Sequence, residues 1–368
     1  MNPSQTPFQT PLQKNSKKLL ENPDPLVVGA TGAGALLVGL VAALGGWIGY
    51  SALKVNHSTT LPVAIDAERR TFVSPSAGML SYYQNVADMA QNPAQVTRPL
   101  LLIHSINAAG SAYEMRPLFE QYRAIRPVYA LDLPGFGFSD RSRRAYSPAL
   151  YTQAIIDLIS TQLSAGEPVD AVALSLGSEF LARAALLRPD LFRSLTLISP
   201  SGLYSRRTAN GSQRASQGKA SDRLYKTFTF PLWSQALYDL IATRASIRYF
   251  LKGSFEGTID PGLLKYAYLT AHQPGARHAP LYFISGKLFS ADIFETVYSK
   301  LTLPVQVIYD KDPFVKFDRL AELTTVEHPN WRATRIAATR GLPQFDRLPE
   351  TVAALDAFWA DDSSHGDR

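Results

Sequence analysis

The stretch "ALSLGSEFLARAAL", residues 173–186, joins an apolar strand to an amphipathic helix through one sharp turn at Ser175. Small residues, Ala173 and Gly177, stand two positions before and two positions after this serine. The pattern resembles the nucleophile elbow G-x-S-x-G, in which a strained turn exposes a reactive serine and the strand and helix pack closely around it. The alternative is that Ser175 only caps the helix. The strand before it and the helix after it favour the elbow.

Short apolar runs alternate with amphipathic helices along the rest of the chain beyond residue 70. This alternation is typical of a mostly parallel sheet with helices on both faces. One such helix is expected over 148–164, with Ser147 as its cap and Pro148 in its first turn. In sheets of this kind, functional groups gather beyond the carboxyl ends of the strands. The predicted strands are 99–104, 126–133, 169–175, 193–199, 303–310 and 332–338.

Two further segments follow strands of this sheet, "HSINAAGS" at 104–111 and "DLPGFGFSD" at 132–140. Together with the elbow, they resemble the α/β-hydrolase superfamily, which pairs an H-G-x loop after one strand with D-x-P-G-x-G-x-S after the next. The resemblance covers roughly residues 72–360. It implies an α/β-hydrolase fold, with a mostly parallel central sheet, helices on both faces and a helical cap.

The resemblance also implies roles for particular residues. The backbone N–H groups of Ile106 and Leu176 would form an oxyanion hole beside Ser175. His104 and Asn107 would belong to the scaffold of the loop, in which Ser105 replaces the usual glycine.

The family places its catalytic acid after the strand that ends in "LPVQVIY", where this chain reads "DKDPF". Asp312, directly before Pro313, is the best match for the carboxylate. Asp310 is the second candidate, because the loop is one residue shorter than usual. A purely structural reading makes both aspartates turn formers.

The family's histidine base is missing. It belongs to a G-H-x-P segment, and "RGLPQF" at 340–345 aligns so that Arg340 takes the glycine position and Gly341 the histidine position. Two histidines of the expected cap, His272 and His278, could serve as a displaced base, or they could be packing residues. Glu179, one helical turn beyond Ser175, is another candidate, although an acid at this place also stabilises the start of a helix.

The first part of the chain is predicted to be a membrane anchor. Residues 26–53, "LVVGATGAGALLVGLVAALGGWIGYSAL", contain no charge, and a helix of this length would span about 42 Å, more than a hydrocarbon core of about 30 Å. A cleaved signal peptide is the weaker alternative. Basic residues flank both ends almost equally, so the side of the membrane is not predicted. Gly45 and Gly49 could pack against a second such helix.

Composition limits the other functions. The chain has 46% hydrophobic and 18% charged residues and a net charge of +6, which indicates a folded, mildly basic protein. It has no cysteine, and its 6 histidines lack metal-binding spacing, so no metal or cofactor is expected. Basic residues do not alternate with aromatic ones in a nucleic-acid pattern. The expected organisation is a polar tail at 1–25, the anchor at 26–53, a linker at 54–70, hydrolase core at 71–200, a cap at 201–300 with a basic loop at 205–223, core again at 301–360 and a tail at 361–368.

Two functions compete on this evidence. In the first, a membrane-anchored enzyme hydrolyses an ester or related acyl bond of a lipophilic substrate through Ser175. In the second, the scaffold is inactive and binds an apolar ligand or a protein partner, with Arg340 paired to Asp312 in the space of the lost histidine. Lyase and cofactor-independent oxygenase activities also occur in the superfamily, and no residue here singles them out.

Overall fold

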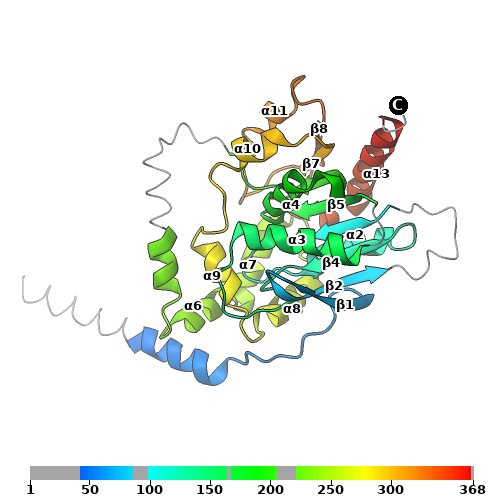
Figure 1. The fold of residues 1–368 in the computed structure, drawn as a ribbon. Coiled ribbons are helices and arrows are strands. Elements are labelled where there is room, and N and C mark those ends of the chain that lie inside the picture. Colours follow the sequence, from blue (N-terminus) through cyan, green and yellow to red (C-terminus); the bar gives the residue numbers. More distant parts are fainter. Residues whose placement is uncertain (1–41, 86–97, 164–166, 205–220, 366–368) are drawn as a thin grey trace, which may run out of the picture. The chain divides into compact units, whose positions relative to one another are not determined.

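A computed structural model describes residues 42–85, 98–163, 167–204 and 221–365 (Figure 1). Residues 51–368 make up one compact unit, and residues 1–50 the other. The larger unit holds one eight-stranded sheet in the order β1-β2-β4-β3-β5-β6-β7-β8. Pairing is parallel from β4 to β8 and antiparallel on both sides of β2. The strands are β1 Glu68–Ser74, β2 Gly78–Asn85, β3 Leu100–Ile103, β4 Val128–Asp132, β5 Val169–Leu174, β6 Phe192–Ile198, β7 Val305–Tyr309 and β8 Trp331–Arg335.

Helices cover both faces of the sheet, and the alternation of side chains along β3 shows why. Leu101 and Ile103 pack into one core, together with residues of α3 (Pro148–Gln162) and α4 (Gly177–Leu187). Leu100 and Leu102 pack into the other core, against α2 (Arg116–Tyr122) and α13 (Leu348–His365). Because every residue of β3 is buried, the strand reads as a continuous apolar run rather than an alternating one. The predicted helix at 148–164 and five of the six predicted strands are confirmed within two residues at each end. The sixth strand, predicted at 332–338, is present but ends three residues early, at Arg335.

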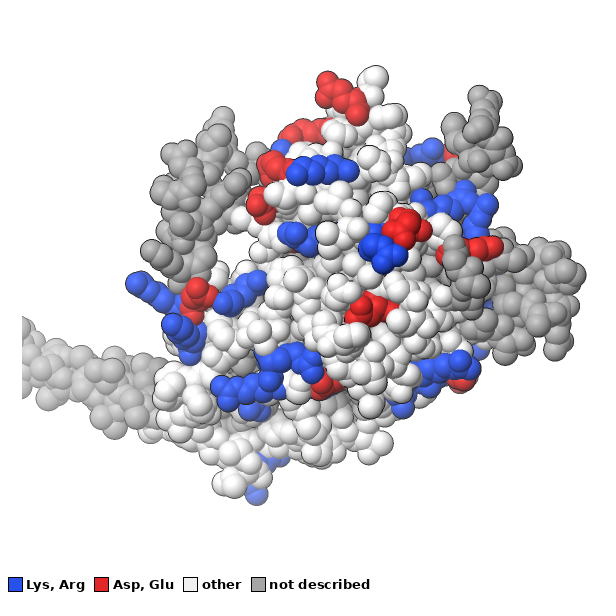
Figure 2. Space-filling model, in the orientation of Figure 1, with Lys and Arg blue, Asp and Glu red and all other residues white. Residues whose placement is uncertain are grey.

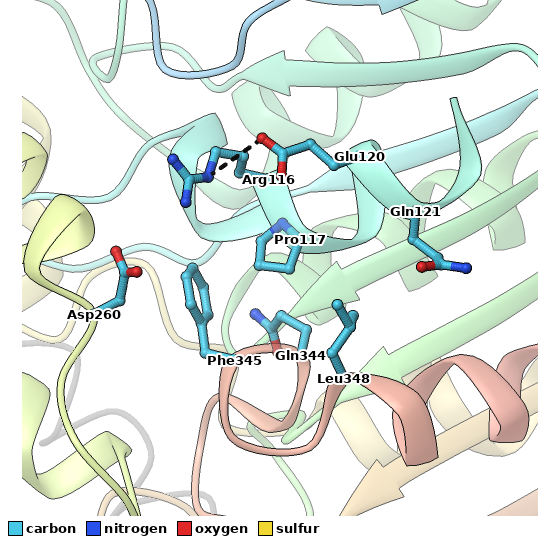
Figure 3. A pocket seen from close by; sticks show the side chains of 8 residues that line it. All are labelled: Arg116, Pro117, Glu120, Gln121, Asp260, Gln344, Phe345 and Leu348. Atoms are coloured by element: carbon cyan, nitrogen blue, oxygen red, sulfur yellow. Dashed lines mark ion pairs between the residues drawn. The ribbon is translucent and has the colours of Figure 1, made fainter. Parts of the chain in front are cut away.

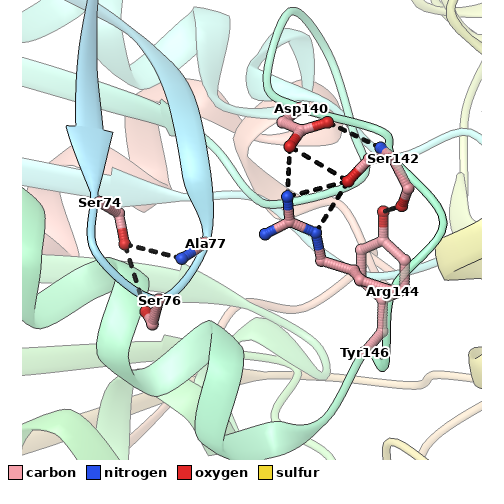
Figure 4. A network of polar contacts seen from close by, with 7 residues as sticks. All are labelled: Ser74, Ser76, Ala77, Asp140, Ser142, Arg144 and Tyr146. Carbon is pink, nitrogen blue, oxygen red and sulfur yellow. Dashed lines mark hydrogen bonds and ion pairs between the residues drawn. The ribbon is translucent and has the colours of Figure 1, made fainter.

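The hairpin β1–β2 was not predicted. Its first strand reads "ERRTFVS" and is mostly exposed, so polar residues interrupt the apolar signal. The turn needs Gly78, whose φ is +76° and whose β-carbon would lie 2.8 Å from an oxygen of Asp140. Asp140 accepts bonds from the Ser142 amide and hydroxyl and pairs with Arg144 (Figure 4). The backbone N–H of Asp140 also donates to the carbonyl of Met79 at 2.8 Å, so the hairpin and the loop after β4 hold each other.

The cap is inserted between β6 and β7, which pair directly in the sheet. Two of its helices begin with side-chain caps, because Thr243 accepts a bond from the Ser246 amide and Asp260 one from the Leu263 amide. The helices between these strands are α6 Ser234–Ile241, α7 Arg244–Ser254, α8 Pro261–Ala271, α9 His278–Ile284 and α10 Ile293–Thr296. Short helices α11 Leu320–Leu323 and α12 Pro343–Asp346 lie beyond β7.

The chain ahead of β1 is bound to the cap at three points. The hydroxyl of Ser51 donates to Asp239 on α6 at 2.5 Å, and Nε2 of His57 lies 2.9 Å from the same carboxylate. Thr59 donates from its hydroxyl to the Leu269 carbonyl at 3.1 Å and accepts a bond from the Gln273 amide. The side chain of Asp239 is only 1% exposed, and it also accepts a bond from the Gln235 amide at 2.8 Å, so these bonds together satisfy a buried carboxylate.

The expected anchor is only partly visible. Residues 26–41 and most of the basic loop, 205–220, lie outside the described residues. Residues 42–54 are helical. Among the residues that the structure describes, no helix combines the length and apolar character needed to cross a membrane. On the face shown in Figure 2, basic and acidic side chains are interspersed and separated by wide uncharged areas.

Candidate active site

Ser175 lies at the turn between β5 and α4 with a φ of +53°, in the left-handed region that a non-glycine residue adopts only under constraint. Its amide donates to the Ile198 carbonyl at 2.8 Å, which ties the turn to the end of β6. A β-carbon at Gly177 would lie 2.5 Å from the His104 carbonyl, so only glycine allows this close approach. The geometry is that of the elbow inferred from the sequence. A serine that only capped α4 would not need the strained backbone.

His104 supports the neighbouring loop through both ring nitrogens. Its Nε2 accepts a bond from the Leu133 amide at 3.0 Å, and its Nδ1 therefore carries the proton and donates to the Ser105 carbonyl at 2.6 Å. Complete burial lowers the pKa of His104 to about 4. The ring is thus neutral and fully engaged, which fits a scaffold role and leaves no nitrogen for catalysis.

Glu114, to which no sequence motif pointed, organises the same loop. Its carboxylate accepts the Ser105 amide at 2.8 Å and the Asn107 side-chain amide at 2.9 Å. Asn107 in turn accepts the Ala109 amide at 2.7 Å. Burial raises the pKa of Glu114, and the hydrogen bonds from Ser105 and Asn107 oppose that rise. The loop that carries Ile106 is therefore held in one conformation from inside the protein.

The backbone N–H groups of Ile106 and Leu176 are available to donate hydrogen bonds, as the donors of an oxyanion hole must be. Ile106 directly follows the Ser105 amide that Glu114 binds, and Leu176 directly follows Ser175. Within the described residues, neither amide N–H donates a hydrogen bond to another group of the protein. The side chains of both residues are buried, so the backbone that carries these two donors is held in place by packing.

Asp132, the first residue of "DLPGFGFSD", has a structural role. Its two carboxylate oxygens accept the amides of Ala112 and Phe138, each at 3.0 Å. A β-carbon at Gly137 would lie 1.9 Å from its carboxyl carbon, so the loop can fold over the aspartate only with glycine there. Burial raises the pKa of Asp132 to about 6. The segment thus holds loops on the carboxyl side of the sheet.

Asp312 and the position of the missing histidine lie together. A β-carbon built on Gly341 would be 3.0 Å from Oδ2 of Asp312. The other oxygen of Asp312 accepts the Phe314 amide at 2.8 Å. Burial raises the pKa of Asp312, and backbone N–H groups on its own loop oppose the rise. The carboxylate is therefore oriented by its loop and directs one oxygen toward residue 341.

Ser199 links this carboxylate to the elbow. It follows Ile198, the residue that accepts the Ser175 amide, and its own amide donates to the Ile308 carbonyl at 2.9 Å. Its φ is +44°. The Ser199 hydroxyl lies close enough to Asp312 to lower its pKa, yet it is buried outside hydrogen-bond geometry and has no partner among the described residues. The ends of β5, β6 and β7 thus bring Ser175, Ser199 and Asp312 to one edge of the sheet.

Asp310, the second candidate for the acid, is engaged elsewhere. It accepts a bond from Nε of Arg335 at 2.7 Å and from the Thr339 amide at 3.3 Å. Burial would raise the pKa of Asp310, but these bonds outweigh it and the pKa is lowered. It acts as an anchor between β7 and β8.

The expected pairing of Arg340 with Asp312 is wrong. Arg340 instead donates from Nε to Glu256 at 2.8 Å, just beyond the end of α7. The guanidinium therefore points to the surface, and Gly341 leaves the oxygen of Asp312 without a side-chain partner from residue 341.

The two cap histidines lie in different surroundings. His272 donates from Nδ1 to the Tyr268 carbonyl at 2.7 Å, and its ring lies against Tyr268 and near His57. Burial, with the charges of Arg277 and Arg143, lowers the pKa of His278 to about 4. A base with such a pKa takes a serine proton poorly at neutral pH. Among the described residues, no hydrogen bond or ring contact joins either histidine to Ser175 or Asp312.

Glu179 is buried inside the protein. Its carboxylate accepts the Ser201 hydroxyl at 2.5 Å and the Ser290 amide at 3.1 Å, which ties α4 to the segment after β6 and to the cap. Burial raises the pKa of Glu179 to about 7. Its contacts explain it as a structural carboxyl group.

The raised pKa of Glu179 leads us to expect that the stability of the fold depends on pH. Between pH 4.5 and about 7, the folded protein keeps the Glu179 proton while the unfolded chain releases it. Rising pH therefore favours unfolding, by on the order of 3 kcal/mol across the window. We expect Glu179→Gln, which cannot titrate, to flatten this slope in urea unfolding measured across the same pH range. An unchanged slope would show that other groups cause it.

A cavity of about 400 Å³ lies elsewhere on the molecule (Figure 3). It is formed by α2, α12 and the cap residue Asp260, and Arg116 and Glu120 face each other across 3.6 Å at its edge. None of its lining residues is a candidate site residue. In the part of the chain that the structure describes, no cluster of acidic or histidine side chains could hold a metal ion.

With this geometry established, the comparison with known families is decisive. Residues 100–362 match the model of the alpha/beta hydrolase family. The chain belongs to the alpha/beta hydrolase family. The alpha/beta hydrolase fold inferred from the motifs, a mostly parallel sheet with helices on both faces, is thereby confirmed.

Individual alpha/beta hydrolases resemble the chain more loosely. An uncharacterised hydrolase of Bacillus subtilis (strain 168), YugF, is 31% identical over 130 residues, which cover 35% of this chain and only 44% of that protein. A putative lipase from Acinetobacter baumannii AYE has a TM-score of 0.61 at 16% identity, over 81% of this chain and 92% of its own. A membrane phospholipase A, described as a bacterial virulence factor, has a TM-score of 0.58 at 16% identity, over 92% and 97%. At such identities the structural matches establish the fold alone.

Proposed function

We propose that this alpha/beta hydrolase cleaves an ester or related acyl bond of a lipophilic substrate, with Ser175 as the nucleophile. The observation that carries the proposal is the φ of +53° at Ser175. Backbone strain of this kind costs about 1–3 kcal/mol and persists at sites where it serves a function. The engaged Glu114 and His104 add a rigid loop beside it.

In the proposed reaction, Oγ of Ser175 attacks the acyl carbon, and the N–H groups of Ile106 and Leu176 stabilise the oxyanion that forms. The acyl group passes to Ser175, the alcohol leaves, and water then releases the acid. Because Gly341 supplies no base, the serine proton passes to solvent water, and the departing alkoxide takes up a proton from water. Without a base, the oxyanion hole and substrate binding still provide about 10³–10⁴-fold acceleration over water. We therefore propose a slow hydrolase.

The lipophilic substrate and the membrane location are parts of the same proposal. The uncharged segment 26–53 supports attachment to a bilayer. The likeness in fold to a lipase and to a membrane phospholipase A is consistent with an acyl-lipid substrate. Esters of increasing acyl length would test it, since turnover should rise with chain length.

A specific observation favours a second function. The oxygen of Asp312 that faces Gly341 has no imidazole partner, as expected for an inactive scaffold that binds an apolar ligand.

A fluorophosphonate serine probe separates the two functions. We expect slow labelling of the full chain that disappears in Ser175→Ala, because the elbow and the oxyanion hole activate that hydroxyl. Circular dichroism would verify that the variant is folded. Labelling that persists in Ser175→Ala, or none at all in the folded wild-type protein, would instead support the binding scaffold.

A further inference from the structure

The outer side of α7 carries an unusual group of exposed aromatic rings. Tyr249 is 73% exposed, Phe250 49% and Phe314 56%. The Tyr249 and Phe250 rings meet edge to face at 5.4 Å, and the Phe250 and Phe314 rings lie 6.2 Å apart. Contiguous exposed rings of this size mark surfaces that contact another phase or partner.

Three cations accompany these rings. Arg244, Arg248 and Lys252 follow one another at intervals of four residues, so they lie along one side of α7, and all three are exposed. Arg244 also lies over the Tyr268 ring at 3.9 Å. Glu256, the first acid beyond the helix, is paired with Arg340 at 2.8 Å and does not neutralise the row. Among the residues of α7, Ile247 is the one that is buried.

This surface, made of Arg244, Arg248, Tyr249, Phe250, Lys252 and Phe314, is named here the α7 rim, and it borders the candidate active site. Phe314 is two residues beyond Asp312, and a β-carbon at Gly253 would lie 2.8 Å from its ring. Ser254, the last residue of α7, has its β-carbon 3.7 Å from where a β-carbon at residue 341 would be. The α7 rim is therefore adjacent to the carboxylate of Asp312.

We propose that the α7 rim is a docking surface for an anionic lipid bilayer. Amphipathic helices that lie in the membrane interface combine Lys and Arg with aromatic side chains, as the sequence of α7 does. Tyrosine favours the headgroup level, and each basic side chain near an anionic surface adds about fivefold to the affinity. Charge complementarity selects anionic over neutral lipid. The aromatic rings, which a purely electrostatic contact with an acidic protein would not use, favour the bilayer.

The proposal requires no turnover, so it stands or falls independently of the proposed hydrolysis. Its effect on that reaction would be to hold the edge of the site against the phase in which an acyl lipid resides.

The absence of cysteine makes a direct test simple, because one introduced thiol can be labelled alone. Tyr249→Cys in the full chain would carry an environment-sensitive fluorophore, and Val326→Cys, at a residue 96% exposed between α11 and β8, is the matched control. Both would be reconstituted with vesicles of phosphatidylcholine, with or without phosphatidylglycerol. Lipid-borne quenchers would report contact of the fluorophore with the bilayer.

With phosphatidylglycerol present, the fluorophore at residue 249 should shift to the blue and be quenched, and the one at 326 should not. Adding Arg248→Glu and Lys252→Glu to the Tyr249→Cys protein should weaken the response by about tenfold or more. A fluorophore at 249 that stays as solvent-exposed as the one at 326 would overturn the proposal. So would shielding that depends on protein concentration and not on lipid, which would assign the rim to a second copy of the chain.

Discussion

Gly341→His is expected to raise the rate at which Ser175 reacts with a fluorophosphonate by about 10²–10⁴-fold, the usual contribution of a general base. A β-carbon at residue 341 would lie 3.0 Å from Oδ2 of Asp312, so the new ring would start beside a carboxylate able to orient it. Gly341 is not among the glycines with positive φ, and a side chain there is compatible with its backbone. The contact is tight, and the carboxylate has to shift by a few tenths of an ångström.

Three variants show whether the gain comes from a base. Gly341→Gln, which adds a polar side chain but no base, should leave the rate near that of the wild-type protein. Asp312→Asn in the Gly341→His background should remove most of the gain, because the imidazole would lose its orienting partner. Ser175→Ala should abolish the reaction in either background. A folded Gly341→His protein that reacts no faster would mean that residue 341 does not face Ser175.

Arg126→Met is expected to destabilise the fold by about 3–5 kcal/mol, since it leaves a buried carboxylate without its cation. Arg126 and Asp170 are 5% and 3% exposed, and Nη2 lies 2.5 Å from Oδ2. Asp170 also accepts the Ser194 hydroxyl at 2.6 Å, so the pair joins the segment just before β4 to β5 and β6, at the end of β5 away from Ser175. The midpoint of urea unfolding should fall accordingly.

An exposed pair of similar geometry provides the control. Arg188 and Asp190 meet at 2.6 Å, but they are 45% and 60% exposed, and Arg188→Met should change the unfolding midpoint little. Replacing Asp170 together with Arg126 by apolar residues should recover much of the lost stability, because no unpaired charge would remain. If Arg126→Met and Arg188→Met had equal effects, burial would not be the cause.

Features that depend on residues close together in the sequence could be predicted, and features that depend on contacts between distant residues could not. The parallel strands β3 to β7 could be found because they are largely buried on both faces and read as mostly apolar runs, as "LLLI" does in β3. The edge hairpin could not, because β1 is largely exposed and its polar residues hide the period. The elbow could be recognised because the serine and the small residues on either side of it, Ala173 and Gly177, lie within five residues of one another.

The parts of the site that depend on distant contacts were out of reach. Glu114 reaches the Ser105 amide nine positions earlier in the chain, and no spacing rule indicates that pair. Arg340 finds Glu256 across 84 positions and not the nearby Asp312. Local pattern thus indicated candidate residues for the chemistry, while the side chains that position them could be identified only from the three-dimensional structure.

The bonds that fix Ser51, His57 and Thr59 to the cap have a mechanical consequence. A pull on the chain ahead of Ser51 reaches α6 and α8 through these bonds before it can reach β1, which begins only at Glu68. The sheet is thereby shielded from tension at the N-terminal side. Any load carried by that part of the chain is borne first by the cap.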